Sequence, residues 1–365
     1  MKLFRCQSCR SIVYFENQKC ERCGHTLGYM PELGTISALE PAGGDLWKPL
    51  AGDGAQRRFC ANAAQDACNW LTPPAGDSPY CLACRHNGTI PDLSDPAHLI
   101  EWREIETAKR RLFYSLLRLN LPLRTRAEDP EHGLIFEFLA DPEANAGPKV
   151  LTGHDEGIIT IALSEADAIE RERRRMQMAE PYRTLLGHFR HEVGHHFWDV
   201  LVRDGGPLEE CRKVFGDDSD DYGQALQRHY NEGAPPDWQE HFVSAYATTH
   251  PWEDFAETWA HYLHIVDTLE MASAFGVSVA PALDNEGSHS ARLDFDPYEA
   301  DSMQRIMDAW APFAVAMNSV NRAMGRPDLY PFVLAPAVVE KLSFIHKLVH
   351  GKVANEAATP RPAAA

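Results

Sequence analysis

The segment His191-Glu192-Val193-Gly194-His195 combines residue types and a spacing that suit a catalytic metal site. His191 and His195 are four residues apart, so on a helix both imidazoles project from the same face. Glu192 follows the first histidine and can reach a water on the metal without itself being a ligand. Two neutral nitrogen ligands and a general base within one helical turn are what a zinc-dependent hydrolase needs. The motif therefore predicts a catalytic zinc site on a helix.

The neighbours of this motif are apolar, which argues against the alternative of an exposed helix face. They are Leu185, Leu186, Phe189, Val193, Phe197, Trp198, Val200 and Leu201. The chain holds seventeen histidines, so the pattern can also arise by chance. A helix this apolar does not, however, bury two histidines and a glutamate without partners.

A zinc peptidase needs a third protein ligand and one coordination position that stays open. Pro251 is a natural first-turn residue, so Glu253 and Glu257 fall one above the other on the helix it begins. We expect Glu253 to ligate the metal and Glu257 to accept the free N–H of a ligating histidine. Asp254, Glu257 and His261 remain alternative ligands. Alternatively, Glu253 and Asp254 could be exposed carboxylates whose negative charge complements the dipole at the start of the helix. This alternative does not explain Glu257, which has aromatic neighbours in the sequence.

Eight of the nine cysteines lie before residue 85, in two groups of four. The first group is Cys6, Cys9, Cys20 and Cys23, which form two Cys-x-x-Cys knuckles; the second is Cys60, Cys68, Cys81 and Cys84. Two knuckles complete a tetrahedral four-sulfur site that suits zinc. Both groups predict closed, structural zinc sites, because four thiolates leave no position for substrate or water. Together with the catalytic ion, we expect three zinc ions.

Three further residues qualify this interpretation of the cysteines. His25 is an alternative ligand in the first group, and His86 is one in the second. Cys211 stands apart and is expected to be an inert buried thiol. A disulfide framework would require export, and the N-terminus shows no apolar signal segment.

The order of these motifs resembles known zinc peptidases. A His-Glu-x-x-His motif followed about sixty residues later by Glu-x-x-x-Glu resembles the gluzincin branch. Tyr246 lies seven residues before Glu253, and Glu253-Asp254-Phe255-Ala256-Glu257 is similar to the Glu-x-Phe-Ala-Glu segment of anthrax lethal factor. This resemblance implies that Glu253 is the third ligand, that Glu257 supports a histidine, and that Tyr246 stabilises the oxyanion.

Over most of residues 3–350, the chain more closely resembles a bacterial family of zinc-binding metallopeptidases with an N-terminal zinc ribbon. Besides the cysteines, the resembling segments are 108–112, 182–192, 215–217, 324–325 and 328–332. His196 stands where a tyrosine is common, but it points away from the face of His191 and His195. The resemblance implies peptidase activity and leaves the substrate open.

The secondary structure that must position these residues is predicted to be α+β, with a few strands followed mainly by helices. Residues 1–95 are expected to form a zinc-ribbon region with sites in 1–28 and 55–90, joined by a Gly/Pro-rich passage. Residues 96–350 are expected to form a mainly helical, zincin-like metallopeptidase domain with a small sheet, and 351–365 a disordered tail. Strands are predicted at 134–139 and 157–163. Helices are predicted at 98–121, 164–178, 182–202, 222–230, 238–246, 252–269 and 298–324.

Local signals define the starts of two of these helices. Ser164, with Asp167 three residues on, resembles a helix cap, and Pro181 sits where a helix-starting proline belongs. The segment 205–221 is expected to be irregular. Its acidic run at 217–221 suits a lid, a contact for a basic substrate or a solvated loop.

Candidate substrate contacts are less sharply defined. The strand at 157–163 could be a sheet edge on which an extended peptide pairs through its main chain, contacting Gly157, Ile158 and Ile159; a core strand is the alternative. Arg322 could pair with a substrate carboxylate, or with a structural carboxylate such as Asp328.

Composition excludes other classes of protein. A formal net charge of −18 argues against a general nucleic-acid binder, and no stretch approaches the roughly 20 apolar residues of a membrane helix. We expect a cytoplasmic protein that acts on a peptide or protein and binds a protein partner through its ribbons. One alternative is a non-catalytic zinc-ribbon adaptor with a degenerate peptidase scaffold, which leaves Glu192 unexplained. Another is a nucleic-acid-binding ribbon with a hydrolase attached, which the few basic residues near the ribbon hardly support.

Overall fold

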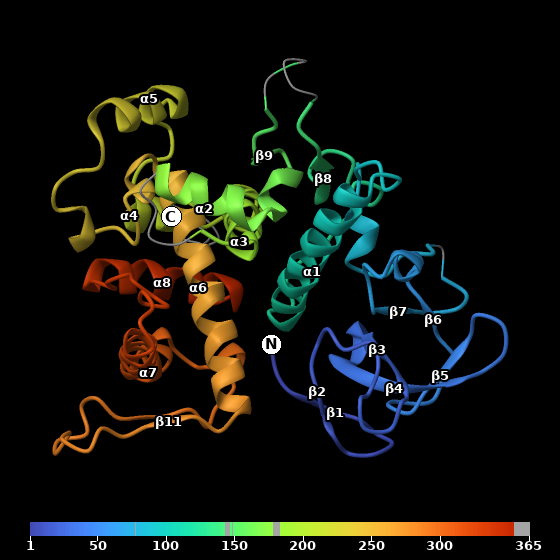
Figure 1. The fold of residues 1–365 in the computed structure, drawn as a ribbon. Coiled ribbons are helices and arrows are strands. Elements are labelled where there is room, and N and C mark those ends of the chain that lie inside the picture. Colours follow the sequence, from blue (N-terminus) through green and yellow to red (C-terminus); the bar gives the residue numbers. More distant parts are fainter. Residues whose placement is uncertain (77, 143–146, 148, 178–182, 354–365) are drawn as a thin grey trace, which may run out of the picture. The chain divides into compact units, whose positions relative to one another are not determined.

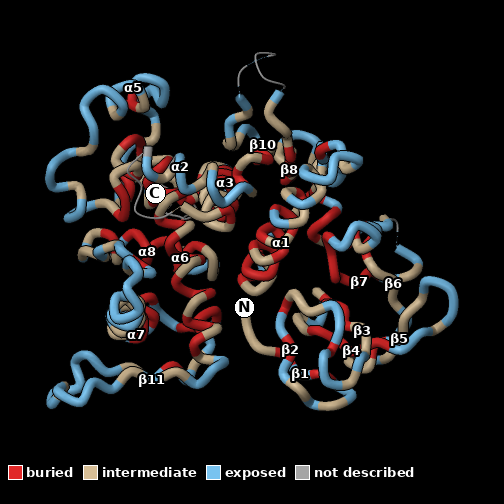
Figure 2. Tube along the Cα trace, viewed as in Figure 1, coloured by how far each residue is buried: buried red, intermediate tan, exposed pale blue. Residues whose placement is uncertain are grey.

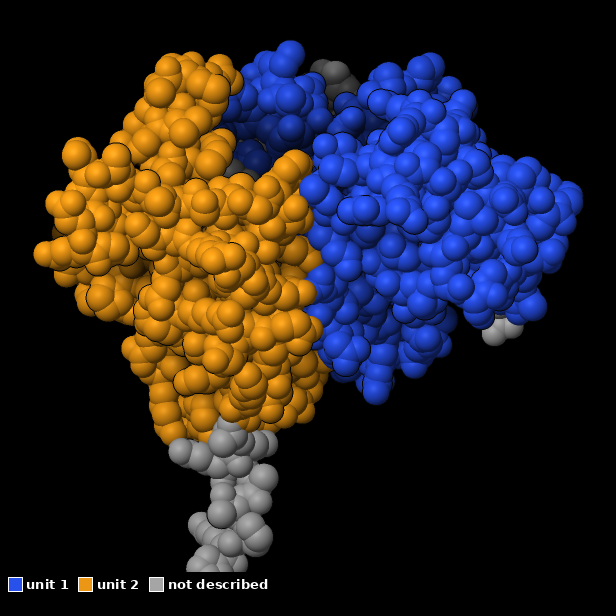
Figure 3. Space-filling model, turned by 90° about the horizontal axis from the view of Figure 1, so that it is seen from below, with its two compact units in different colours: residues 1–189 blue, residues 190–365 orange. Residues whose placement is uncertain are grey.

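The computed structural model describes residues 1–76, 78–142, 147, 149–177 and 183–353. The chain divides into two compact units, residues 1–189 and 190–365 (Figure 3). The division falls inside a helix, and not at the residue-95 boundary expected for the ribbon region. That domain assignment therefore stays a prediction. The α+β class is confirmed, because helices dominate and the sheets are small (Figure 1).

The first unit begins with three small antiparallel sheets. They are the pair β1 (Phe4–Arg5) and β2 (Ile12–Val13); the sheet β3 (Thr26–Met30), β4 (Thr35–Pro41) and β5 (Trp47–Pro49); and the pair β6 (Arg58–Phe59) and β7 (Leu71–Thr72). The Gly/Pro-rich passage between the cysteine groups contains the strands β3, β4 and β5. Its glycines lie in turns between and beside these strands: Gly34, Gly43 and Gly44 have positive φ angles of 56°, 96° and 61°.

A buried aromatic cluster connects these sheets to the first long helix, α1 (Pro96–Arg118). Tyr29 lies with its ring centroid 4.7 Å from Trp70 and 4.9 Å from Phe15. Phe15 in turn lies 5.4 Å from Tyr114 of α1. The helix begins two residues before the predicted start at 98, because the Asp95 side chain caps it by accepting a hydrogen bond from the backbone N–H of Ala97 at 2.8 Å.

A three-stranded sheet follows, formed by β8 (Ile135–Leu139), β9 (Gly153–Asp155) and β10 (Ile158–Ala162), in the order β8-β10-β9. The strand expected as a sheet edge is therefore the central strand. Ile158 and Ile159 pair with β8 on one side and with β9 on the other. A tight turn at Glu156 and Gly157, both with positive φ, folds β9 onto β10. Main-chain pairing of a peptide at Gly157, Ile158 and Ile159 is thus contradicted.

The helix α2 (Ala168–Gln177) completes the described part of the first unit before α3. Its cap is Asp167, whose Oδ1 accepts from the backbone N–H of Ile169 at 2.7 Å. The predicted cap at Ser164 is wrong, because Ser164 lies in a preceding 3₁₀ turn, Leu163–Ala166. The predicted helix start at Pro181 and Tyr182 lies outside the described residues, as does the end of α2 near 178.

The second unit is helical. Its elements are α3 (Leu185–Trp198), which continues as a π-helical turn (Asp199–Arg203), α4 (Leu208–Phe215), α5 (Tyr222–Glu232), α6 (Pro251–Ala274), the hairpin β11 (Ser278–Val279) and β12 (Ala291–Arg292), α7 (Met303–Ala323) and α8 (Pro336–Val349). The first residues of α3 still belong to the first unit. Figure 2 shows α6 buried along most of its length. Buried carboxylates and a buried histidine on such a helix require partners.

Three sequence predictions fail in this unit. The helix expected at 238–246 is replaced by the 3₁₀ turns Trp238–Glu240 and Tyr246–Thr248. Side chains take the backbone groups that a helix would use: Lys341 Nζ donates to the carbonyl of His241, and Ser244 Oγ accepts from the N–H of Ala247. The segment expected to be irregular contains α4, and α8 was not foreseen. Residues 354–365, expected to be a disordered tail, lie outside the described residues. None of the described helices has both the length and the apolar character needed to cross a bilayer.

Candidate active site and metal centres

The candidate active site lies where α3 and α6 approach closely. A Cβ placed on Gly194 would lie 2.9 Å from Ala256 Cα and 3.2 Å from its carbonyl oxygen. Only glycine at 194 permits this distance between the two helix backbones. The approach brings the histidine face of α3 within reach of the carboxylates that flank Ala256 on α6.

Three donor atoms converge between these helices: His191 Nε2, His195 Nε2 and Glu253 Oε2. The two nitrogens lie 3.2 Å apart, and Glu253 Oε2 lies 3.1 Å from one and 3.4 Å from the other. Ligands about 2.0–2.1 Å from a tetrahedral zinc ion would be about 3.3–3.4 Å apart. Glu253 Oε2 is also buried and forms no hydrogen bond among the described residues. The donors therefore fit a zinc ion in type, number and spacing.

The ring of His191 is oriented by a chain of hydrogen bonds. Its Nδ1 lies 2.7 Å from Glu257 Oε1, and Ser244 Oγ donates to Glu257 Oε2 at 2.6 Å. A carboxylate at Nδ1 fixes the tautomer that presents an unprotonated Nε2 to a metal. His195 is held differently, with its ring centroid 3.8 Å from that of Trp252. Ser244 was missed by sequence reasoning, since nothing local in the sequence marks it.

The alternative third ligands are engaged elsewhere. Asp254 is buried on another face of α6 and lies 2.6 Å from Lys341 Nζ. His261 Nδ1 lies 2.7 Å from the hydroxyl of Tyr330, and burial lowers the pKa of His261 to about 4. Glu257 faces Nδ1 of His191 rather than the converging donor atoms. Among the described candidates, only Glu253 completes the histidine pair.

The second carboxylate oxygen of Glu253 receives two tyrosine hydroxyls. Tyr222 donates to Glu253 Oε1 at 2.6 Å, and Tyr246 donates to the same atom at 3.2 Å. Tyr246 was expected at this site, whereas Tyr222 was not. Glu192 is buried beside the donors, and this burial raises the pKa of its carboxyl to about 7.

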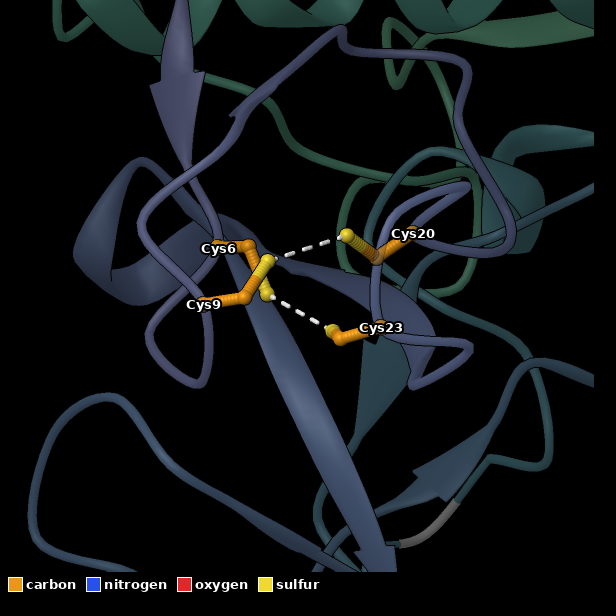
Figure 4. Close-up of side chains that lie close together, drawn as sticks. All are labelled: Cys6, Cys9, Cys20 and Cys23. Carbon is orange, nitrogen blue, oxygen red and sulfur yellow. Dashed lines mark hydrogen bonds between the residues drawn. The ribbon is translucent and has the colours of Figure 1, made fainter.

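The first cysteine group forms a four-sulfur cluster (Figure 4). Cys6 Sγ lies 3.6 Å from Cys23 Sγ, and Cys9 Sγ lies 3.6 Å from Cys20 Sγ. Sulfurs about 2.3 Å from a tetrahedral zinc ion would be about 3.8 Å apart. Neither His25 nor His86 belongs to a donor cluster of the described residues. The chemistry and spacing of these sulfurs fit zinc.

The second cysteine group, Cys60, Cys68, Cys81 and Cys84, also forms a cluster, and it is buried throughout. Cys68 Sγ and Cys81 Sγ lie 3.7 Å apart. Backbone N–H groups support it: that of Trp70 donates to Cys68 Sγ at 3.4 Å, and that of Cys81 donates to Cys60 Sγ at 3.3 Å. His86 is occupied elsewhere, because its Nδ1 lies 2.8 Å from the carbonyl oxygen of Leu134.

A buried ion pair lies beside this second cluster. Glu106 and Lys109 of α1 are both fully buried, and Lys109 Nζ lies 2.7 Å from Glu106 Oε1. The thiol of Cys84 lies 3.5 Å from Glu106 Oε2. Lys109 therefore neutralises the buried carboxylate that lies next to the cysteine cluster. Cys211 is separate, and burial raises the pKa of its thiol to about 12, as suits an inert thiol.

The remaining candidate substrate residues have partners within the chain. Arg322 forms a two-pronged pair with Asp328, at 2.5 and 2.6 Å, which matches the structural alternative. In the acidic run, Asp218 pairs with Arg212 at 2.6 Å and Asp221 caps α5. Asp218 and Asp221 therefore stabilise the local structure of the chain. A role of the acidic run as a lid or a substrate contact stays a prediction.

Comparisons with known proteins agree with this site. A family model described as "Putative zinc-binding metallo-peptidase" matches residues 98–348, and a zinc-ribbon domain model matches residues 3–95. Uncharacterised proteins of Mycobacterium bovis and Mycobacterium tuberculosis are each 43% identical over 350 residues, which cover 96% of this chain and 95% of each relative. No solved structure matches the chain significantly.

Proposed function

The chain belongs to the zinc-binding metallopeptidase family that matches residues 98–348, and we propose that it is an endopeptidase with its zinc held by His191, His195 and Glu253. The observation that carries this proposal is the convergence of three donor atoms of the right types between α3 and α6. Three protein donors leave the fourth coordination position of a tetrahedral zinc ion open for water or substrate. A catalytic zinc site needs this open position, whereas a structural site has four protein ligands. Glu192 follows the first histidine, within reach of that position.

Bound zinc would polarise a peptide carbonyl and make water more acidic. A carboxylate oxygen of Glu192 would take the proton of the attacking water and pass it to the leaving nitrogen. The Tyr246 hydroxyl would donate to the carbonyl oxygen as negative charge develops there. Glu257 would keep the proton on Nδ1 of His191, so that Nε2 stays a ligand.

We further propose that the two cysteine clusters hold structural zinc ions, three zinc ions per chain in all. Their sulfur spacings and the match to a zinc-ribbon domain support this. A structural role suits closed sites, because four thiolates complete the coordination. The ribbons remain a candidate surface for a protein partner, and the cytoplasm a suitable compartment for reduced thiols.

The test is Glu192→Gln in the full chain, with zinc counted by atomic absorption and hydrolysis followed on a library of internally quenched peptides. We expect hydrolysis to fall by at least about 10³-fold while the zinc content stays that of the wild type. His191→Ala is the matched control, and it should lose both activity and one zinc ion. Cleavage by Glu192→Gln at the wild-type rate would exclude the mechanism. Zinc-loaded wild type that cleaves no peptide would favour the non-catalytic adaptor.

A further inference from the structure

The first residue of α5, Tyr222, reaches the candidate active site from a distant part of the chain. Its hydroxyl lies 2.6 Å from Glu253 Oε1, in the range of a charge-assisted hydrogen bond to a carboxylate. Its ring packs edge-on against Trp252, with centroids 5.8 Å apart. The side chain is 36% exposed, so it is not simply a core residue. These contacts require the loop before α5 to be held in place.

A histidine at the start of α6 holds that loop. His250 Nδ1 accepts a hydrogen bond from the N–H of Trp252 at 3.1 Å, which caps the helix. A neutral imidazole that accepts at Nδ1 carries its proton on Nε2. That Nε2 lies 3.1 Å from the carbonyl oxygen of Asp220 and therefore donates to it. The same residue thus caps α6 and ties the loop next to Glu253.

Two hydroxyls share one oxygen of Glu253, and their distances differ. Tyr222 is at 2.6 Å, whereas Tyr246 at 3.2 Å lies beyond the usual range for O–H···O bonds. The other oxygen, Oε2, faces His191 and His195. If the Tyr246 hydroxyl turned toward a substrate, Tyr222 would still hold Oε1 and keep Oε2 directed at the histidines.

We infer that Tyr222 is a positioning residue, which fixes the Glu253 carboxylate and leaves Tyr246 available for the substrate oxyanion. The inference rests on the proposed peptidase site and assigns separate tasks to its two tyrosines. Tyr222 acts through the metal ligand and does not touch the reacting atoms. Its loss should therefore weaken metal binding, whereas loss of the Tyr246 hydroxyl should mainly slow turnover.

The experiment compares Tyr222→Phe and Tyr246→Phe in the full chain. The affinity for the exchangeable zinc ion is measured by competition with a chromophoric chelator, and His191→Ala supplies the background of the thiolate sites. Tyr230→Phe is the matched control, because Tyr230 is an exposed tyrosine of the same helix. Turnover is measured separately, at saturating zinc.

We expect Tyr222→Phe to weaken zinc affinity about 10–100-fold, and Tyr230→Phe to leave it unchanged. Tyr246→Phe should keep zinc affinity within about threefold and lower kcat about 10²–10³-fold at similar KM. Wild-type zinc affinity in Tyr222→Phe would overturn the inference, and so would equal losses in both variants. Zinc affinity needs no substrate, so the comparison decides the role of Tyr222 even if the wild type cleaves no peptide and the proposed function fails.

Discussion

Replacement of Gly194 by alanine should separate the two helices that build the candidate active site. The new Cβ would lie 2.9 Å from Ala256 Cα, about 0.5 Å short of the 3.4 Å at which ordinary contact begins. The obstructing atoms belong to the backbone of α6, so they cannot turn aside as a flexible side chain would. Overpacking of this kind costs about 1–3 kcal/mol. Alanine regains about 1 kcal/mol through its higher helix propensity, so the net loss of stability should be about 0–2 kcal/mol.

The effect of Gly194→Ala on zinc should be larger than its effect on folding. A catalytic constellation tolerates displacements of only about 0.5 Å, so zinc affinity should fall at least about tenfold, or about 1.4 kcal/mol. Chelator competition and urea unfolding measure the two quantities. Ala256→Gly should not rescue the variant, because the closest obstructing atoms, Cα and the carbonyl oxygen, remain. Gly223→Ala on α5, whose new Cβ would meet nothing closer than 3.4 Å, should not destabilise the fold. Wild-type zinc affinity in Gly194→Ala would refute the reasoning.

Two further predictions concern the first unit. Lys109→Met should destabilise it by about 3–5 kcal/mol in urea unfolding, because Glu106 then keeps a buried charge without its partner. Adding Glu106→Gln to the same chain should restore most of this lost stability. A double variant as unstable as Lys109→Met would contradict the pairing. Burial opposes ionisation of Glu165, but hydrogen bonds and charges from His188 and Arg183 outweigh it and lower its pKa from 4.5 to about 2. A depressed pKa adds stability above pH 4.5, so stability should fall from about pH 4.5 toward pH 2, with a shallower slope in Glu165→Gln. Parallel acid-unfolding curves for the two proteins would argue against this ion pair.

What the sequence predicts well depends on contacts within one helix. The spacing of His191 and His195, and that of Glu253 and Glu257, follows from the 3.6-residue period once each helix is recognised. The structure brings the first three of these residues together and places Glu257 behind His191. The resemblance of residues 253–257 to a segment of anthrax lethal factor added support for Glu253 as the third ligand. The family match confirms only the resemblance to zinc-binding metallopeptidases.

The failures come from contacts between residues far apart in the sequence. The helix expected at 238–246 is lost because Lys341, about 100 residues away, takes the carbonyl of His241. Tyr222 reaches the site directly after a loop that His250, about 30 residues later, ties to α6. Central and edge strands have the same hydrophobic pattern, so periodicity alone could not place β10. Local sequence carries none of this information.

The ion pair between Asp254 and Lys341 gives the buried face of α6 a second fixed contact. Adjacent helical residues point about 100° apart, so Asp254 and Glu253 face different neighbours. Lys341 on α8 holds Asp254 at 2.6 Å, while the histidines of α3 face Glu253. Two polar contacts at different angles fix the rotation of α6 about its axis, which apolar packing alone specifies loosely. A buried ion pair contributes little net stability, so we infer that this one serves mainly to orient α6. The Asp254 carboxylate thus helps to set the direction in which Glu253, the proposed metal ligand, points.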